Sequence, residues 1–204
     1  MPRYGNVDTT YALHLATCPP EQDGPIYMLN LMKYRDRADY GPAGGPDISG
    51  EEADNRYAPL AVLAELGARV CFFGTVVGGS EDWDRVAVVR YPTRRTFIDM
   101  QARTDFQDKH VHKEAGMLRT TILGTLPTGD LPTAAAPGQV QFELRPLPGV
   151  ADEGAILAVE GAIVGDGREW ADVSVRALVD DAAPEAAAGV MRLVVQPALE
   201  AWYA

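Results

Sequence analysis

Cysteine and histidine are scarce in this chain of 204 residues, which holds two cysteines and three histidines. Cys18 and Cys71 stand far apart, so they give neither a disulfide framework nor the paired spacing of a metal site. HExxH, CxxC and similar ligand patterns are also missing from the sequence. We therefore expect no bound metal and no tightly bound organic cofactor.

Clusters of basic residues and long apolar runs are missing as well. The formal net charge is −11 at pH 7, and no group of Lys and Arg offers a surface for a phosphate backbone. No apolar stretch approaches the roughly 18 residues that a membrane span needs. The first residues lack the apolar segment of a signal peptide. These features predict a cytoplasmic protein that binds neither nucleic acid nor membrane.

What the chain does have is ample apolar material and a partial internal repeat. Hydrophobic residues make up 47% of the sequence. The segment Gly74–Pro92 aligns without a gap with Gly161–Val179, with six identities that include Trp83 and Trp170. Each copy predicts a strand, a glycine-containing turn and a second strand. The alternative is two unrelated hairpins, since glycine-rich turns between valine-rich strands are common.

The first 126 residues predict the element order βαββαβ, preceded by a short helix. Ser49 and Glu52 have the spacing of a capping box, which begins a helix. Pro59 should kink that helix and Gly67 should end it. The expected strands are 26–34, 68–77, 83–91 and 117–126, and the later helices are 93–103 and 105–115.

Residues 139–204 predict more strands but few helices. Residues 127–138 hold three prolines and two glycines and are expected to be a linker. Further strands are expected at 139–147, 155–164, 169–179 and 190–203, with a helical turn or two at 184–188. A sheet this small and bare is not expected to be stable alone, so it should pack on the open face of the first sheet.

The expected fold class is therefore α+β. Two ferredoxin-like βαββαβ-type lobes in tandem, the second degenerate and helix-poor, would form an intramolecular pseudo-dimeric α/β barrel. Residues 1–126 would be the ferredoxin-like lobe with the pocket, and residues 139–204 the degenerate sheet lobe. Such a chain would be a monomer, as a pseudo-dimer, or a weak homodimer.

Several motifs occur in order over about Val7–Leu126: Gly24–Arg35, Ser49-Gly-Glu, Tyr57, Trp83–Thr93, Phe106-Gln and His112-Lys-Glu-Ala-Gly. Together they resemble an uncharacterised domain-of-unknown-function family of the dimeric α/β-barrel superfamily. The resemblance implies a ferredoxin-like sheet that pairs with a second sheet, usually supplied by another subunit. Related families include cofactor-free monooxygenases, muconolactone-type isomerases, polyketide cyclases, and haem-binding peroxidases and decarboxylases, so the fold does not fix the function.

His112 and His110 are the candidate catalytic residues. Histidine titrates near neutral pH and is the usual general acid or base. Two positions on a helix differ by about 200°, so the two rings should point in opposite directions and not share a metal. His112 matches the family position and stands four residues after Asp108, which could orient it. The alternative is that both are surface or capping histidines.

Asn30, Arg90, Tyr57 and Lys33 are the candidate substrate-binding residues. The amide of Asn30 lies in an apolar strand, and the charge of Arg90 lies in the middle of a strand, so each needs a partner or a ligand. Structural roles are the alternative: Asn30 would pin a loop, Arg90 would pair with an acidic residue, and Tyr57 would belong to the core.

These residues favour a small-molecule enzyme without a metal that acts on a polar or conjugated carbonyl compound. Isomerisation, cyclisation and cofactor-free oxygenation are the expected reaction types. The pocket would lie between the sheet and the helices of residues 1–126, with residues 35–50 as a lid. One alternative is a non-catalytic small-molecule-binding or assembly protein, and another is a haem-binding protein that uses one histidine.

Overall fold

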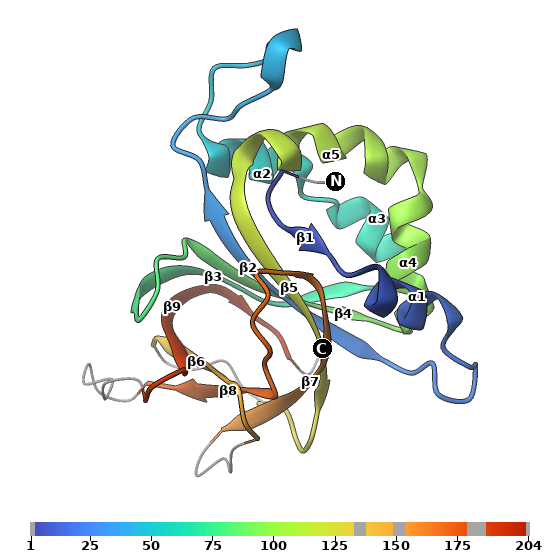
Figure 1. Cartoon of the computed structure of the whole chain (residues 1–204), viewed down its shortest axis with the longest axis vertical. Coiled ribbons are helices and arrows are strands. Elements are labelled where there is room, and N and C mark those ends of the chain that lie inside the picture. Colours follow the sequence, from blue (N-terminus) through green and yellow to red (C-terminus); the bar gives the residue numbers. More distant parts are fainter. Residues whose placement is uncertain (1–2, 133–137, 149–153, 179–186, 203–204) are drawn as a thin grey trace.

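The strands of this protein form one closed antiparallel barrel (Figure 1). The computed structural model describes residues 3–132, 138–148, 154–178 and 187–202. Within them the strands are β1 (Asn6–Val7), β2 (Ile26–Tyr34), β3 (Arg69–Gly79), β4 (Arg85–Tyr91), β5 (Met117–Pro127), β6 (Val140–Arg145), β7 (Ala155–Gly165), β8 (Asp172–Ala177) and β9 (Met191–Glu200). Their order is β1-β7-β5-β2-β4-β3-β9-β6-β8, and a further pairing of β7 with β8 closes the ring.

The closed barrel corrects the expectation of two ferredoxin-like lobes forming a pseudo-dimeric α/β barrel. The strands after residue 139 do not make a second sheet laid over the first. Instead, β9 pairs with β3 and β7 pairs with β5, so the described strands all belong to one hydrogen-bonded sheet. The physical reason is that an open sheet edge leaves backbone N–H and C=O groups unpaired, and closure pairs them.

Glycine and strand irregularities bend β3 where it passes from β4 to β9. A Cβ atom on Gly74 would lie 2.6 Å from the backbone oxygen of Gln196, so only glycine allows this approach. The β3–β9 register shifts between Phe73 and Gly74 and again between Val76 and Gly78. Such bulges sharpen the local twist and let a long strand curve around a barrel.

Apolar side chains fill the interior of the barrel. The two tryptophans of the repeat, Trp83 and Trp170, both belong to this core, as do Phe72 and Phe142, whose ring centroids are 4.8 Å apart. Trp202 stacks on Phe72 at 5.8 Å between centroids. Alternate residues of β2 and β4 point inward to this core, because successive strand side chains face opposite sides.

The helices lie together on one side of the barrel, against the outer face of β2, β4, β5 and β7 (Figure 1). None of the helices in the described part of the chain has the length and apolar character that crossing a bilayer requires. They are α1 (Thr9–Thr17), α2 (Gly50–Tyr57), α3 (Leu60–Glu65), α4 (Arg94–Ala102) and α5 (Thr104–Gly116), with a 3₁₀ turn η1 (Gly41–Ala43).

Local sequence signals set the helix ends. The Ser49 hydroxyl accepts a hydrogen bond from the Glu52 N–H at 3.1 Å and so begins α2. Thr93 does the same for α4 through the Thr96 N–H. The helical segment is interrupted at Pro59, which separates α2 from α3. Gly67, with φ of 67°, follows α3 and lets the chain turn toward β3. The turn expected at residues 184–188 lies largely outside the described residues.

Candidate functional site

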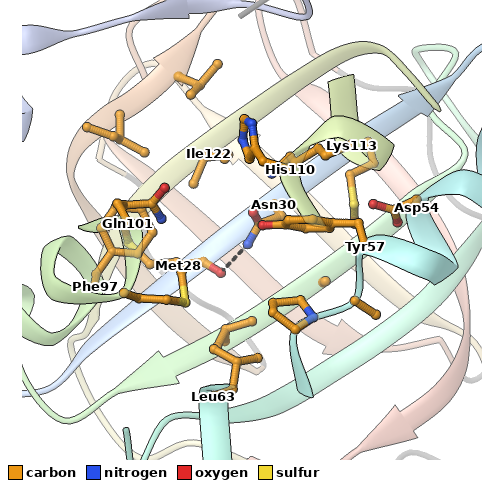
Figure 2. A pocket seen from close by; sticks show the side chains of 18 of the residues that line it. Met28, Asn30, Asp54, Tyr57, Leu63, Phe97, Gln101, His110, Lys113 and Ile122 are labelled. Carbon is orange, nitrogen blue, oxygen red and sulfur yellow. Dashed lines mark hydrogen bonds between the residues drawn. The ribbon is translucent and has the colours of Figure 1, made fainter. Parts of the chain in front are cut away.

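A cavity of about 690 Å³ lies between the helices and the outer face of the sheet (Figure 2). This volume is within the range of small-molecule sites, roughly 300–1,000 Å³. Strands β2 and β4 form its floor, and α2, α3, α4 and α5 contribute to its walls. The lining is mostly apolar, with Met28, Leu63, Val89, Phe97 and Ile122 among its members.

The alternation of side chains along β2 explains how the sequence builds this floor. Leu29 and Leu31 point into the barrel, while Met28, Asn30 and Met32 point toward the helices and line the cavity. The break at Pro59 also lies against the cavity, where it keeps α2 and α3 from forming one continuous helix.

Asn30 is a polar side chain in the middle of this floor. Its Nδ2 donates to the backbone oxygen of Met28 at 2.9 Å, as the dashed line in Figure 2 shows. Its Oδ1 has no hydrogen-bond partner among the described residues, although the side chain is half-buried. The amide therefore has hydrogen-bonding capacity left for a ligand.

His110 is held against the cavity by aromatic neighbours. Its Nε2 lies 2.9 Å from the Tyr4 hydroxyl, and its ring makes edge contacts with Tyr57 at 6.1 Å between centroids. Burial lowers the pKa of His110, and the charge of Lys113 lowers it further. A neutral imidazole is thus favoured at pH 7, and Nδ1 has no hydrogen-bond partner within the described chain.

Tyr57, like Asn30, lines the cavity (Figure 2). Burial raises the pKa of Tyr57 well above its ordinary value, so the hydroxyl keeps its proton. No hydrogen bond to this hydroxyl occurs within the described residues, and the side chain lines the cavity. Tyr57 is therefore a hydrogen-bond donor available to a bound molecule.

Lys113 is a cavity residue that the sequence reasoning missed. Its side chain is 7% exposed, and its Nζ lies 5.5 Å from the ring centroid of Tyr4 and 5.1 Å from that of Tyr57. The described residues offer this amine neither a hydrogen bond nor an ion pair. Burial lowers the pKa of Lys113, against the opposing charges of Asp54 and Glu114. The spacing His110-x-x-Lys113 was the available signal, because residues i and i+3 share a helix face.

A buried ionic cluster forms one wall of the cavity, and the sequence reasoning missed it too. Asp54 accepts a hydrogen bond from the Tyr34 hydroxyl at 2.8 Å and one from Arg85 Nη1 at 3.4 Å. The Arg85 guanidinium lies 4.6 Å from the ring centroid of Phe73 and 5.1 Å from that of Tyr34. The two opposite charges are thus paired within the wall of the cavity.

Three predicted site residues lie away from the cavity. His112 points the other way on α5, where its Nδ1 lies 2.8 Å from the Tyr40 hydroxyl. Lys33 is ion-paired with Asp82 at 2.6 Å and Asp84 at 2.9 Å. Arg90 is half-buried on the barrel-facing side of β4.

The structure thus brings Asn30, Tyr57 and His110 together and separates His112, Lys33 and Arg90 from them. Residues 35–50, expected to be a lid, contribute none of the lining found in the described chain. Across that same part of the chain, no group of three or more His, Cys, Asp or Glu side chains is placed to hold a metal ion.

Solved structures similar to this chain include two of a protein of unknown function. No protein-family model and no curated protein matches it. The crystal structure of a methylated RPA0582 protein is 28% identical, with a TM-score of 0.53, and the match covers 63% of this chain and 98% of that one. A second structure, of the RPA0582 protein of unknown function from Rhodopseudomonas palustris, is 26% identical, with a TM-score of 0.52, and covers 62% and 99%.

These matches fit an uncharacterised family and do not assign the chain to the dimeric α/β-barrel superfamily. Nearly the whole of each solved chain aligns with less than two thirds of this one. The chain is therefore similar, over most but not all of its length, to a protein described as having no known function.

Proposed function

We propose that the protein is a small-molecule enzyme that binds a carbonyl compound in the helix–sheet cavity and moves a proton at the carbon beside the carbonyl group. The observation that carries this proposal is a neutral, oriented histidine, His110, beside an apolar cavity of about 690 Å³ that also holds unpaired hydrogen-bonding groups. This chemistry belongs to the isomerase and cyclase classes.

The cavity lining supports a ligand that is mostly apolar with one polar end. Apolar side chains surround most of the space, and burial of a ligand's hydrocarbon surface there is favourable by about 25 cal/mol per Å². Asn30 and Tyr57 both line the cavity, and each can donate a hydrogen bond to a ligand oxygen: Tyr57 through its hydroxyl, and Asn30 through the second N–H of Nδ2. Such fixed polar groups determine the orientation of a ligand in an apolar pocket.

The proton transfer would use His110 as the base. Its neutral form accepts a proton from the carbon, while the contact with Tyr4 holds the ring in place. Negative charge then develops on the carbonyl oxygen, and the protonated hydroxyl of Tyr57 stabilises it by donating a hydrogen bond. Return of the proton to a different carbon gives an isomer, and attack of the enolate carbon on a second group gives a ring.

Deuterium exchange tests this proposal without knowledge of the natural substrate. The probe is 4-phenylbutan-2-one in D₂O, and proton NMR follows loss of the signals next to the carbonyl. The wild-type protein should accelerate this exchange over buffer. His110→Asn should reduce the acceleration roughly 100-fold or more, the usual contribution of a general base. His112→Asn is the matched control on the same helix and should stay within about twofold of wild type.

Two outcomes would remove the proposal. If the ketone binds but the wild-type protein does not accelerate exchange, the cavity serves binding alone, which is the non-catalytic alternative. If both histidine variants lose the activity equally, His110 is not the base. A haem absorbance band in the purified protein would favour the haem-binding alternative instead.

A further inference from the structure

The chain has three lysines, Lys33, Lys109 and Lys113, and they lie in different surroundings. Lys33 is ion-paired with two aspartates. Lys109 is on α5, partly exposed and outside the cavity. Lys113 alone combines burial with a place in the cavity lining. Helix α5 therefore carries Lys113, which lines the cavity, and Lys109, which does not and can serve as a control in experiments.

The buried position of Lys113 lowers the stability of the fold, which suggests that the amine is retained for a function. Lysine is almost never fully buried without a partner, because an ammonium group loses its hydration there. The faces of Tyr4 and Tyr57 attract the cation, and this offsets only part of that loss. The two carboxylates that line the cavity have other partners: Asp54 is bonded by Tyr34 and Arg85, and Glu114 lies 3.7 Å from Arg3. An apolar side chain would fill the same space without this cost.

We propose that the Nζ of Lys113 is a nucleophile that forms an imine with the carbonyl compound bound in the cavity. This inference rests on the proposed function and narrows its substrate class to aldehydes and unhindered ketones. The geometry that carries it is a buried amine that lines an apolar cavity and has no hydrogen-bonding partner within the described chain.

The step needs no oxidant, reductant or second substrate. The lone pair of the neutral amine attacks the carbonyl carbon, and the carbonyl π pair moves to oxygen, which takes up the proton that nitrogen loses. The hydroxyl group then leaves with a second proton from nitrogen as water, and the C=N bond forms. Burial lowers the pKa of Lys113 and so favours the neutral amine that the attack requires.

The neighbouring histidine suits this chemistry. His110 is three residues before Lys113 on α5, and both line the cavity, as Figure 2 shows. It can carry protons between nitrogen and oxygen during imine formation. A protonated imine also withdraws electrons more strongly than a carbonyl group, so the proton on the next carbon becomes easier for His110 to remove. The two residues would thus act on adjacent carbons of the same substrate, Lys113 on the carbonyl carbon and His110 on the carbon beside it.

Reductive trapping tests the imine directly. The full-length protein is incubated with 3-phenylpropanal and sodium cyanoborohydride, and intact mass and peptide mapping locate the adduct. Each trapped imine adds the mass of the aldehyde less one oxygen atom. We expect one dominant adduct, on Lys113, in wild type and in Lys109→Met. Lys113→Met and Lys113→Arg should lose it, and the arginine variant keeps the positive charge while being unable to form the imine.

Calorimetric titration with 3-phenylpropan-1-ol, which cannot form an imine, separates the two proposals. If the alcohol binds the cavity but the aldehyde gives no adduct on Lys113, the imine is overturned and the binding cavity stands. Equal labelling of Lys33, Lys109 and Lys113 would also overturn it. If neither compound binds and no adduct forms, both the imine and the proposed function fail. Thermal unfolding of the variants shows that a lost adduct does not reflect a lost fold.

Discussion

The two faces of the same sheet have opposite characters. The inner face, closed into a barrel, is covered by aliphatic and aromatic side chains such as Leu29, Phe72 and Phe142, which are fully buried. The outer face borders a cavity under the helices, and this cavity is lined by the amide of Asn30 on β2 and the amine of Lys113 on α5. Dense packing stabilises a fold, whereas unpaired polar groups around a void cost stability and suit binding. We therefore expect the barrel to serve as the scaffold and the helix layer to carry the binding site.

Neighbouring residues on β2 give the sharpest way to test this comparison. Leu29 points into the barrel and Met28 into the cavity, and both are fully buried. We expect Leu29→Ala to lower the free energy of unfolding by about 3–5 kcal/mol, because a new void opens in a filled core. Met28→Ala should cost about 2 kcal/mol, at the low end of its range, because the side chain already faces empty space.

Urea unfolding of the two variants provides the measurement. Equal m-values would show that both unfold to the same state and that the midpoints can be compared. Equal losses of stability, or a larger loss in Met28→Ala, would mean that the cavity is filled in solution and that the two faces do not differ as described.

A carboxylate on β7 fastens the helix layer to the barrel. Glu160 accepts a hydrogen bond from the Tyr11 hydroxyl of α1 at 2.9 Å, and Arg94 Nε of α4 lies 2.9 Å from its Oε1. Burial raises the pKa of Glu160, but the bonds from Arg94 and Tyr11 outweigh it, so its pKa is lowered overall. Glu160→Gln should cost about 2 kcal/mol at pH 7, between the values of exposed and fully buried pairs.

The stabilisation by Glu160 should depend on pH, because the pKa of its carboxyl group is lower in the folded protein. The contribution of a carboxylate with a lowered pKa is present above the unfolded pKa of about 4.3 and is lost as the pH falls through the lower, folded value. The wild-type advantage over Glu160→Gln should therefore be constant from pH 7 to about pH 5 and shrink below that. Parallel stability curves down to pH 3 would show that Glu160 does not carry the attachment.

The local structure could be read from the sequence because its causes are local. The apolar run Ile26–Tyr34 is β2 with the expected bounds, and Ser49 and Thr93 cap helices where predicted. Pro59, predicted to kink one helix, instead separates α2 from α3. Closure could not be read in the same way, because it depends on pairing between β3 and β9, which are far apart in sequence. Strand patterns fix which face is buried but not which distant edge is joined.

The site was predictable only where a residue type was out of place. Asn30 was predicted because it is an amide in an apolar strand, and His110 because the chain has only three histidines. Both residues line the cavity. Lys113 gave no such signal, since lysine on a helix is ordinarily exposed. Its burial results from the way in which α5 lies over Tyr4 and Tyr57, which comes from packing between distant segments.

The smallest expected effect concerns Lys113 itself and tests whether the helix layer gives up stability for function. Lys113→Met keeps most of the length of the side chain and removes a buried amine that has no hydrogen-bonding partner in the described chain. Removing the desolvation cost offsets the loss of the contacts with the two tyrosines, so the free energy of unfolding should stay within about 1 kcal/mol of wild type or rise. Thermal unfolding at pH 7 measures this, with Lys109→Met as the control for a lysine outside the cavity.

A loss of about 3 kcal/mol or more would instead show that the ammonium group holds α5 in place, as expected for a buried charge with a structural partner. An unchanged or higher midpoint, together with the loss of the trapped adduct, would show that this amine is kept for its chemistry.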